Sequence, residues 1–321
     1  MTQQYLRRVK LVVGGSAYPG VTNNPAPAID LSELHIIFEV GNATAQTLKY
    51  ARIKIYNLSD ETANQIQNEF TRVELSAGYG DDIGLIFQGQ IAIVKHGKLN
   101  ATDTFLEIFA QDGDAAYNFA VTNKTLSAGW TPDQLHSSLL QDLEPYGIKQ
   151  GYKPPFKGAS AFRGRACYGM TRDYLRDLAE QQGCEWSIED GRLNFVPLSS
   201  FIPGEAVVLN NDSGLIGTPT QTTGGIEIRC LLNARIKSGC QVQIANSALA
   251  TMNQRQPILG QGIHVVAGID RDGAYKALFV QHRGDTRGQD WYTSMICLAV
   301  DPTAAIPLGG PTLLAVPEGG G

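Results

Sequence analysis

The chain has 321 residues, of which 43% are hydrophobic and 18% charged, and its formal net charge is −5. This length is enough for two or three domains, each with a core of its own. Because the charge balance is acidic and no run of five like charges occurs, the composition argues against a surface of clustered Lys and Arg that grips nucleic-acid phosphates. The 35 glycines and 15 prolines favour frequent turns and short strands, so we expect a β-dominated chain.

The five cysteines form no Cys-x-x-Cys pair, and their number is odd. We therefore expect reduced thiols and synthesis in the cytoplasm. The first residues, Met1 to Arg8, lack the apolar core of a signal peptide. No apolar run approaches the roughly 18 residues that span a bilayer, so we expect no membrane segment.

Strands dominate the first 120 residues. The segment 50–56 alternates basic residues with isoleucines, which is typical of a half-buried strand. Ser59 is a suitable N-cap for a short helix that carries Ile66 and Phe70 on one face. Further strands are expected at 34–40, 72–79, 85–96 and 104–110, with a turn at 80–84.

The hydrophobic period changes from two to about four between residues 125 and 200. Thr131, Pro132 and Gln134 combine an N-cap, a first-turn proline and a capping-box residue, and they predict a helix that ends before 145–147. A second helix is expected from Thr171 to a glycine cap at Gly183. A hairpin with its tight turn at 189–191 completes a small α+β module.

Strands resume after residue 205, and we expect a second β domain. The predicted strands are 226–232, 242–244, 264–269, 275–282 and 291–300, with a loop at 246–262. The last residues have few ways to bury themselves and are expected to order only against a partner. The predicted division is 1–122 for a first barrel-like domain, 123–204 for the α+β module, 205–302 for a second barrel-like domain and 303–321 for an extended tail.

Two stretches 186 residues apart share one plan. In each, an apolar strand reaches a histidine, a short polar turn with glycine follows, and an aspartate opens an aromatic-rich strand. The corresponding landmarks are His96 and Asp103 in the first copy, and His282 and Asp290 in the second. A plan used twice predicts two copies of one β domain, so three chains would place six copies around an axis. Superposition of the two domains should bring His96 near His282.

Candidate catalytic residues form no recognisable motif. The five histidines are isolated from one another, and no Gly-x-Ser-x-Gly, His-Glu-x-x-His or phosphate-binding loop occurs. We expect no cofactor and no metal site. The paired acids Asp81-Asp82, Glu189-Asp190 and Asp112 with Asp114 fall in predicted turns, where carboxylates are common for conformational reasons. Cysteine catalysis stays open, because Cys and His partners meet in space rather than along the chain.

Two further patterns have structural explanations. The tripeptide Arg283-Gly284-Asp285 also occurs in adhesion ligands, but here it is expected to lie in a hairpin whose glycine makes the turn. Aromatic and basic residues alternate in 152–157 and 162–165, a pattern that suits stacking on single-stranded nucleic acid. A proline-rich connector leading into a strand that carries Arg163 and Arg165 on one face is the simpler interpretation.

Several runs of this chain resemble baseplate hub proteins of contractile-tailed bacteriophages, the tail hub or late control protein D-like family. The runs 210–219, 223–233, 236–242 and 280–291 are similar to the second tube domain of those proteins. Residues 51–59 and 86–91 are similar to the first tube domain, and 169–179 to the middle module. The similarity covers most of residues 30 to 300, and the order of the motifs is more specific than any one of them.

The resemblance implies a structural protein of the virion tail baseplate, made in the cytoplasm of a bacterial host. It implies a homotrimer whose six tube-type barrels form a pseudo-hexameric ring between the sixfold tail tube and the threefold central spike. Its partners would be the tail tube protein, the central spike protein, the tape-measure protein and neighbouring baseplate proteins, and genomic DNA would pass through the lumen without specific binding. The net charge of −5 predicts a neutral or acidic channel wall.

Two alternatives stay open. The first is a distal tail or spike-base adaptor of a contractile injection system, built from the same barrels. The second is a glycan hydrolase that uses a pair of turn carboxylates. The family resemblance favours a protein that is not an enzyme.

Overall fold

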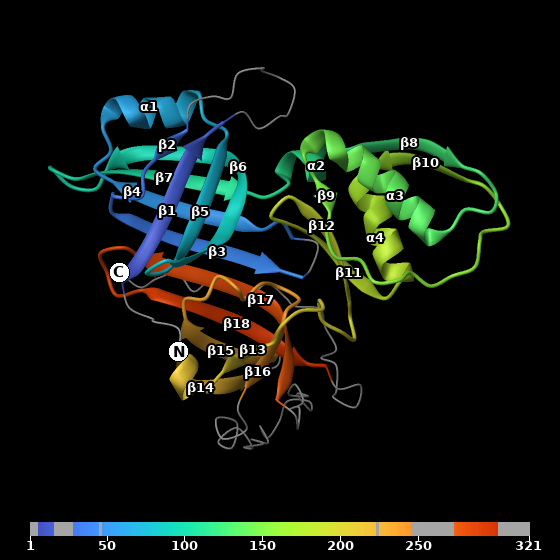
Figure 1. Cartoon of the computed structure of the whole chain (residues 1–321). Helices are drawn as coiled ribbons and strands as arrows, with labels where there is room; N and C mark the ends of the chain where they lie inside the picture. Colours follow the sequence, from blue (N-terminus) through green and yellow to red (C-terminus); the bar gives the residue numbers. More distant parts are fainter. Residues whose placement is uncertain (1–5, 16–27, 45–46, 223–224, 245–272, 301–321) are drawn as a thin grey trace, which may run out of the picture.

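The computed structural model describes residues 6–15, 28–44, 47–222, 225–244 and 273–300. Strands account for 51% of the structure and helices for 17%, which confirms the predicted β-dominated fold. Two strand-rich parts adjoin each other, and a helix-containing module projects from one side of them (Figure 1). The expected loop at 246–262, the strand at 264–269 and the tail at 303–321 lie outside the described residues.

Within the described residues, 13 strands form one curled sheet. They are β1 (Arg7–Gly14), β2 (Ile29–Asp30), β3 (Ile36–Ala43), β4 (Tyr50–Tyr56), β5 (Arg72–Tyr79), β6 (Asp82–Lys98), β7 (Thr104–Gln111), β13 (Val207–Leu209), β14 (Leu215–Thr222), β15 (Gly225–Leu231), β16 (Gln241–Ile244), β17 (Ala274–Asp285) and β18 (Trp291–Ala299). Their order is β14-β15-β18-β17-β3-β4-β7-β6-β5-β1-β2, with β16 beside β17 and β13 beside β16.

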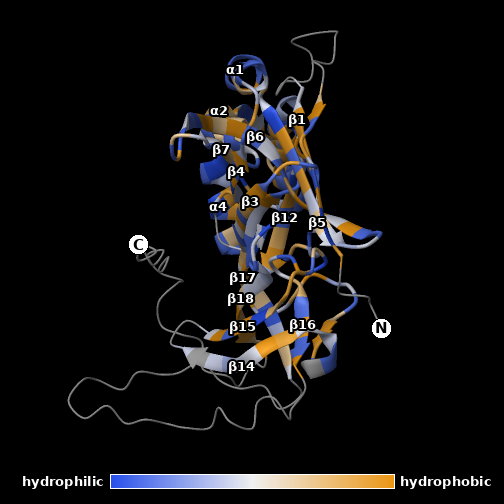
Figure 2. Ribbon diagram, turned by 90° about the vertical axis from the view of Figure 1, so that its left-hand side faces the viewer, coloured by the Kyte–Doolittle hydropathy of each residue, from blue (hydrophilic) through white to orange (hydrophobic). Residues whose placement is uncertain are grey.

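The two strand-rich parts join where β17 pairs with β3. Residues Phe279–Asp285 run antiparallel to Ile37–Ala43, with Phe279 opposite Ala43 and Asp285 opposite Ile37. We call this pairing the internal seam. It connects the N-terminal and C-terminal parts of the chain in one hydrogen-bonded surface, which extends from α1 (Asp60–Asn68) at one end to β14 at the other (Figure 2).

Three clusters of buried side chains form the cores. The first lies in the β1–β7 part and includes Phe38, Ile53 and Phe87. The second lies in the middle module, and the third lies in the β13–β18 part. Trp291 opens β18 but belongs to the first cluster, where its ring meets the edge of Phe38 at a centroid separation of 5.5 Å. The two strand-rich parts therefore share packing as well as hydrogen bonds.

The middle module packs α3 and α4 together, and α4 packs against β11. Its elements are α2 (Asp114–Phe119), β8 (Val121–Leu126), α3 (Pro132–Leu143), the 3-10 turn η1 (Glu144–Tyr146), β9 (Lys149–Gln150), β10 (Arg165–Met170), α4 (Thr171–Gln181), β11 (Cys184–Glu189) and β12 (Arg192–Pro197). A second 3-10 turn, η2 (Asn211–Ser213), precedes β14.

Local signals placed several of these elements correctly. Ser59 caps α1 by accepting a hydrogen bond from the backbone N–H of Thr62. Gly183 follows α4 with a φ of +61°, as a C-terminal glycine should. The β11–β12 hairpin turns at Asp190 and Gly191, whose φ values of +52° and +70° are those of a type I′ turn. These three predictions are confirmed.

The capping box of α3 is also confirmed. The Thr131 hydroxyl accepts from the backbone N–H of Gln134 at 3.3 Å, and the Gln134 side chain accepts from the backbone N–H of Thr131 at 3.0 Å. We expect Thr131→Ala to lower the free energy of unfolding by about 1 kcal/mol, because a helix donor loses its partner. Urea unfolding followed by circular dichroism measures this change. Thr131→Ser keeps the hydroxyl and should behave like the wild type; equal losses in both variants would contradict the assignment.

Some boundaries differ from the sequence prediction. β6 begins at Asp82, so the preceding turn is confined to Gly80 and Asp81. Asp114 opens α2 rather than a turn. Arg163 precedes β10, which begins at Arg165, so the two arginines do not share a strand face. Phe70 is buried but follows the end of α1. Each error concerns the end of an element, where tertiary packing decides how far hydrogen bonding extends.

The expectation that Arg283-Gly284-Asp285 forms a turn is wrong. These residues are the last three of β17 and pair with β3 in the internal seam. A Cβ atom at Gly284 would collide with the Phe38 ring and with Trp291. The glycine is therefore required by close packing at the seam, and the tripeptide is part of a sheet rather than an exposed loop.

Candidate functional site

One face of the continuous sheet is polar, and we call it the polar face. It runs across β15, β18, β17, β3, β4, β7 and β6. On each of these strands the residues of the opposite face belong to the cores. Its charged residues are the basic Arg52, Lys54, Lys95, Arg229 and Arg283 and the acidic Glu39, Glu107 and Glu227.

Contacts between neighbouring strands hold these charges in place. Arg283 donates to Glu39 at 2.7 Å across the internal seam, and Arg52 donates to Glu107 at 2.7 Å. Other cations lie over aromatic rings: the Arg229 guanidinium is 4.2 Å from the centroid of Tyr292, and the ammonium of Lys95 is 4.7 Å from that of Phe109. The face therefore mixes paired charges with aromatic surface, and it is not a band of unpaired cations.

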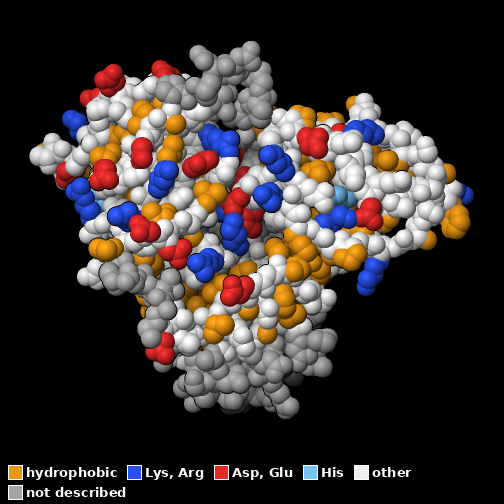
Figure 3. All heavy atoms as spheres, viewed as in Figure 1, with side chains coloured by type: hydrophobic (Ala, Val, Ile, Leu, Met, Phe, Trp, Pro, Cys, Tyr) orange, Lys and Arg blue, Asp and Glu red, His pale blue; other side chains and the backbone are white. Residues whose placement is uncertain are grey.

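A different face of the molecule, drawn in Figure 3, also carries acidic and basic side chains close to one another. Neither description supports a large single-sign patch of the kind that grips a phosphate backbone. Within the described residues, no helix has the length and apolar character needed to cross a membrane. No group of three or more metal-ligating side chains gathers there either.

The four landmark residues take up related positions in two hairpins. His96 lies in β6 opposite Leu106, and His282 lies in β17 opposite Thr293. Asp103 and Asp290 immediately precede β7 and β18, and the backbone carbonyl of each closes its hairpin loop by accepting from Leu99 and Asp285 respectively. Burial separates the two histidines, because His96 is exposed whereas His282 is 5% exposed. That the four residues are paired landmarks of a duplicated fold stays a prediction.

Neither histidine touches a carboxylate in a catalytic arrangement. The Nδ1 atom of His282 is 2.9 Å from the Thr293 hydroxyl oxygen. Burial, with Lys49 and Lys237 acting in the same direction, lowers the pKa of His282 to about 3. The imidazole is therefore neutral over the physiological range, and its role is to fill and hydrogen-bond the interior beneath the seam.

The cysteines show no activated thiol. Burial raises the pKa of Cys230 to about 12 and that of Cys240 to about 11, and it raises the pKa of Cys297 well above the ordinary value. A thiol is a nucleophile only as the thiolate. The geometry of these three residues thus gives no support to the cysteine chemistry that the sequence left open.

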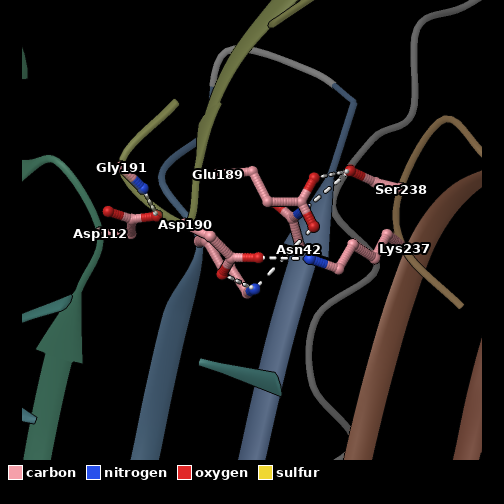
Figure 4. Close-up of polar contacts among 8 residues, drawn as sticks. Asn42, Asp112, Glu189, Asp190, Gly191, Lys237 and Ser238 are labelled. Atoms are coloured by element: carbon pink, nitrogen blue, oxygen red, sulfur yellow. Dashed lines mark hydrogen bonds and ion pairs between the residues drawn. The ribbon is translucent and has the colours of Figure 1, made fainter. Parts of the chain in front are cut away.

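Sequence reasoning missed a buried charged cluster at the junction of the three parts of the chain (Figure 4). We call it the junction cluster, and it consists of Asn42, Lys49, Asp112, Glu189, Asp190, Lys237 and Ser238. Asp190 is its centre, because its two carboxylate oxygens accept from Lys49 at 2.7 Å and from Lys237 at 2.6 Å. Lys49 comes from the first strand-rich part, Asp190 from the β11–β12 turn and Lys237 from the second strand-rich part.

Neutral hydrogen bonds extend the junction cluster. Asn42 donates to the Ser238 hydroxyl at 2.7 Å, and Ser238 donates to Glu189 at 3.3 Å. Asp112 accepts from the backbone N–H of Gly191 at 3.1 Å. The turn that the sequence predicted at 189–191 is thus held on both sides by side chains far away in the chain.

The junction cluster balances burial against charge. Burial acts to raise the pKa of Asp190, but Lys49 and Lys237 outweigh it and hold that pKa below its ordinary value. Burial raises the pKa of Glu189, because its single ionic contact, at 3.8 Å to Lys49, is longer. Burial also raises the pKa of Asp112 to about 7. One firmly ionised acid between two lysines is a structural clamp, and the two protonated acids beside it do not form a hydrolytic pair with a solvent path.

The raised pKa of Asp112 predicts a pH dependence of stability. The unfolded chain loses the Asp112 proton near pH 4, whereas the folded chain keeps it to about pH 7. Stability should therefore fall as pH rises from about 4 to 7, by at most about 4 kcal/mol from this residue. Asp112→Asn should remove this contribution and be more stable than the wild type at pH 8.

Thermal unfolding of both proteins at several pH values measures the effect. The exposed Asp81 provides the control, since Asp81→Asn should follow the wild-type profile. If Asp112→Asn has the same pH profile as the wild type, then Asp112 is ionised in the folded state and the assignment is wrong.

No protein-family model matches the chain, and no curated protein matches its sequence significantly. Solved structures do match its fold. The 43 kDa tail protein of prophage MuSo2 from Shewanella oneidensis has a TM-score of 0.56 at 11% identity, over 92% of this chain and 99% of that one. The tail protein of Neisseria meningitidis MC58 has a TM-score of 0.57 at 10% identity, over 91% of this chain and 96% of that one.

A component of the type VI secretion system of Escherichia coli also matches, with a TM-score of 0.50 at 10% identity over 90% of this chain and 76% of that one. That protein is described as structurally similar to the bacteriophage T4 tail proteins gp27 and gp5. At these identities the comparisons show a shared fold. The chain has the fold of phage tail proteins, and at the level of the fold the resemblance to tail hub proteins is confirmed.

Proposed function

We propose that this chain is a structural hub of a phage tail baseplate. Three copies form a ring with six barrel-like positions, which matches the sixfold tail tube on one side and the threefold central spike on the other. The division into 1–122, 123–204, 205–302 and 303–321 describes the first tube domain, the middle module, the second tube domain and the tail. In this role the protein adapts symmetry and catalyses no reaction.

The internal seam is the observation that carries this proposal. Two strand-rich parts of one chain lie side by side in a single curled sheet, so each chain already contains two adjacent positions of a larger ring. The fold shared with tail proteins of Shewanella and Neisseria supports the same assignment. The junction cluster fixes the angle between the two positions, because Lys49 and Lys237 are both bound to Asp190.

The polar face is the surface that we assign to the channel. Its five basic and three acidic side chains, with the ion pairs Arg283–Glu39 and Arg52–Glu107, offer a passing duplex no continuous phosphate clamp. This lining is mixed, whereas the net charge led us to expect a neutral or acidic wall. Tail tube, spike and tape-measure proteins are the partners that a ring of this kind would contact, and the assembled protein would reside in the virion tail.

The mass of the purified chain tests the proposal. Light scattering should give a mass three times that of the monomer, either for the chain alone or for the chain recovered from tails. A monomer in both preparations, or a monomer that cleaves peptidoglycan, would contradict a hub. The alternative function, a spike-base component of an injection system, is favoured by the match to the Escherichia coli secretion component. A distal tail adaptor differs from both in copy number, with six copies rather than three per tail.

A further inference from the structure

One edge of β6 has no neighbouring strand among the described residues. The first part of β6 pairs with β5 up to Gln90, and the second part pairs with β7 from Gln90 to Lys98. From Ala92 to Lys98 the edge opposite β7 is therefore unpaired within the described part of the chain. Ile93 is 54% exposed there, and Leu99, just beyond the end of β6, is 55% exposed. Unpaired apolar strand edges are natural sites for the addition of another strand.

The corresponding edge of β17 is occupied. β16 pairs with the start of β17, as β5 does with the start of β6, and β3 then pairs with Phe279–Asp285. The β6–β7 and β17–β18 hairpins also share an irregularity, a bulge between Ile91 and Ile93 in one and between Ala277 and Phe279 in the other. The bulge positions lie 186 residues apart, so the two hairpins correspond residue by residue.

The correspondence continues along the sheet. β7, β4 and β3 follow β6 in the same order in which β18, β15 and β14 follow β17. β14 is thus the counterpart of β3, but where β3 is covered by β17, the outer edge of β14 is unpaired within the described residues. Ile216 on β14 is 40% exposed, and Pro219, which cannot donate to a ladder, fits an edge strand with a register shift.

We infer that the β6 edge of one copy pairs antiparallel with the β14 edge of a second copy, by the geometry of the internal seam. This inference deepens the proposed function and rests on it, because it names the surface through which copies of the hub join. Each copy has one edge of each kind, so the contact is head to tail and closes into a ring. In a ring of three copies, internal seams alternate with seams between chains.

The internal seam supplies the register. Asp285 lies opposite Ile37; Leu99 lies 186 residues before Asp285, and Ile216, opposite Arg229 on β15, is the counterpart of Ile37. Leu99 of one copy should therefore face Ile216 of the next, which pairs two exposed apolar side chains. Beyond the β14 bulge, Lys95 should face Thr222. Directly opposed residues in an antiparallel pair have Cα atoms about 4.5–5.5 Å apart.

A disulfide trap tests this register. The variant L99C/I216C should form covalent oligomers under mild oxidation, because its two thiols lie within bridging distance across the seam. The variant L99C/T222C is the matched control, since Thr222 should lie about 13 Å further along the strand. The wild-type chain gives the background, and four of its five cysteines are buried. The trap is applied to the purified chain and to assembled tails, with non-reducing gels as the readout.

The expected result is at least a tenfold excess of covalent oligomer in L99C/I216C over L99C/T222C, with a trimer as the largest product. Charge substitutions provide a second readout that needs no oxidant: L99K should weaken assembly, and L99K/I216E should restore it. An assembly of trimeric mass in which the two cysteine pairs cross-link equally would overturn the seam and leave the hub intact. A chain that stays monomeric both alone and in tails would overturn the seam and the hub together.

Discussion

Replacing Lys49 with methionine is expected to lower the free energy of unfolding by about 3–5 kcal/mol, because it removes one partner from a buried ionic contact. The Lys49 side chain is only 4% exposed, and its ammonium lies 2.7 Å from Asp190. Methionine has a similar length but offers no hydrogen bond. Asp190 would then keep one lysine instead of two, and Glu189 would lose its only ionic contact.

Chemical denaturation of the variant measures this loss, and two further variants make the result interpretable. Arg8 makes an exposed ion pair with Asp81 at 3.8 Å, so Arg8→Ala should have no measurable effect. The double variant Lys49→Met/Asp190→Asn should recover part of the loss, because it removes the orphaned charge. If Lys49→Met is as stable as the wild type, the junction cluster does not hold the three parts of the chain together.

Replacing Trp291 with alanine is expected to cost about 3–5 kcal/mol, the usual range for truncation of a buried aromatic residue. The side chain is 2% exposed and packs in the core of the first strand-rich part, although it opens β18 of the second. The loss should also separate the unfolding of the two parts, because they would keep the hydrogen bonds of the internal seam without the packing beneath it.

Calorimetry shows both effects, as a lower midpoint and as a broader or divided transition. Phe162 is 98% exposed, so Phe162→Ala is the matched control and should leave the transition unchanged. A Trp291→Ala protein that unfolds in one sharp transition at the wild-type temperature would show that the two parts do not share a core.

The sequence predicted what local chemistry decides. The capping box at Thr131 and the Asp190-Gly191 turn each depend on a few neighbouring residues, so their backbone geometry is encoded locally. Alternation of apolar and polar residues also located most strands of the large sheet. The resemblance to tail hub proteins then supplied the fold, which the structural comparisons confirm.

The sequence did not predict what depends on contacts between distant segments. Glu189 and Asp190 look like ordinary turn carboxylates, yet lysines from the two strand-rich parts bury and bind them. Gly284 looked like a turn residue, whereas the Phe38 ring is what requires it. A buried Lys or Asp has no local signature, because burial is a property of the packed parts rather than of the sequence around it.

The most direct test of the central claim is a symmetry-resolved image of the assembled tail tip. The account predicts three copies of this chain in a ring of six barrel-like positions, with the polar face lining the channel and β6 of each copy beside β14 of the next. A ring of six copies, or a position outside the tube axis, would contradict it.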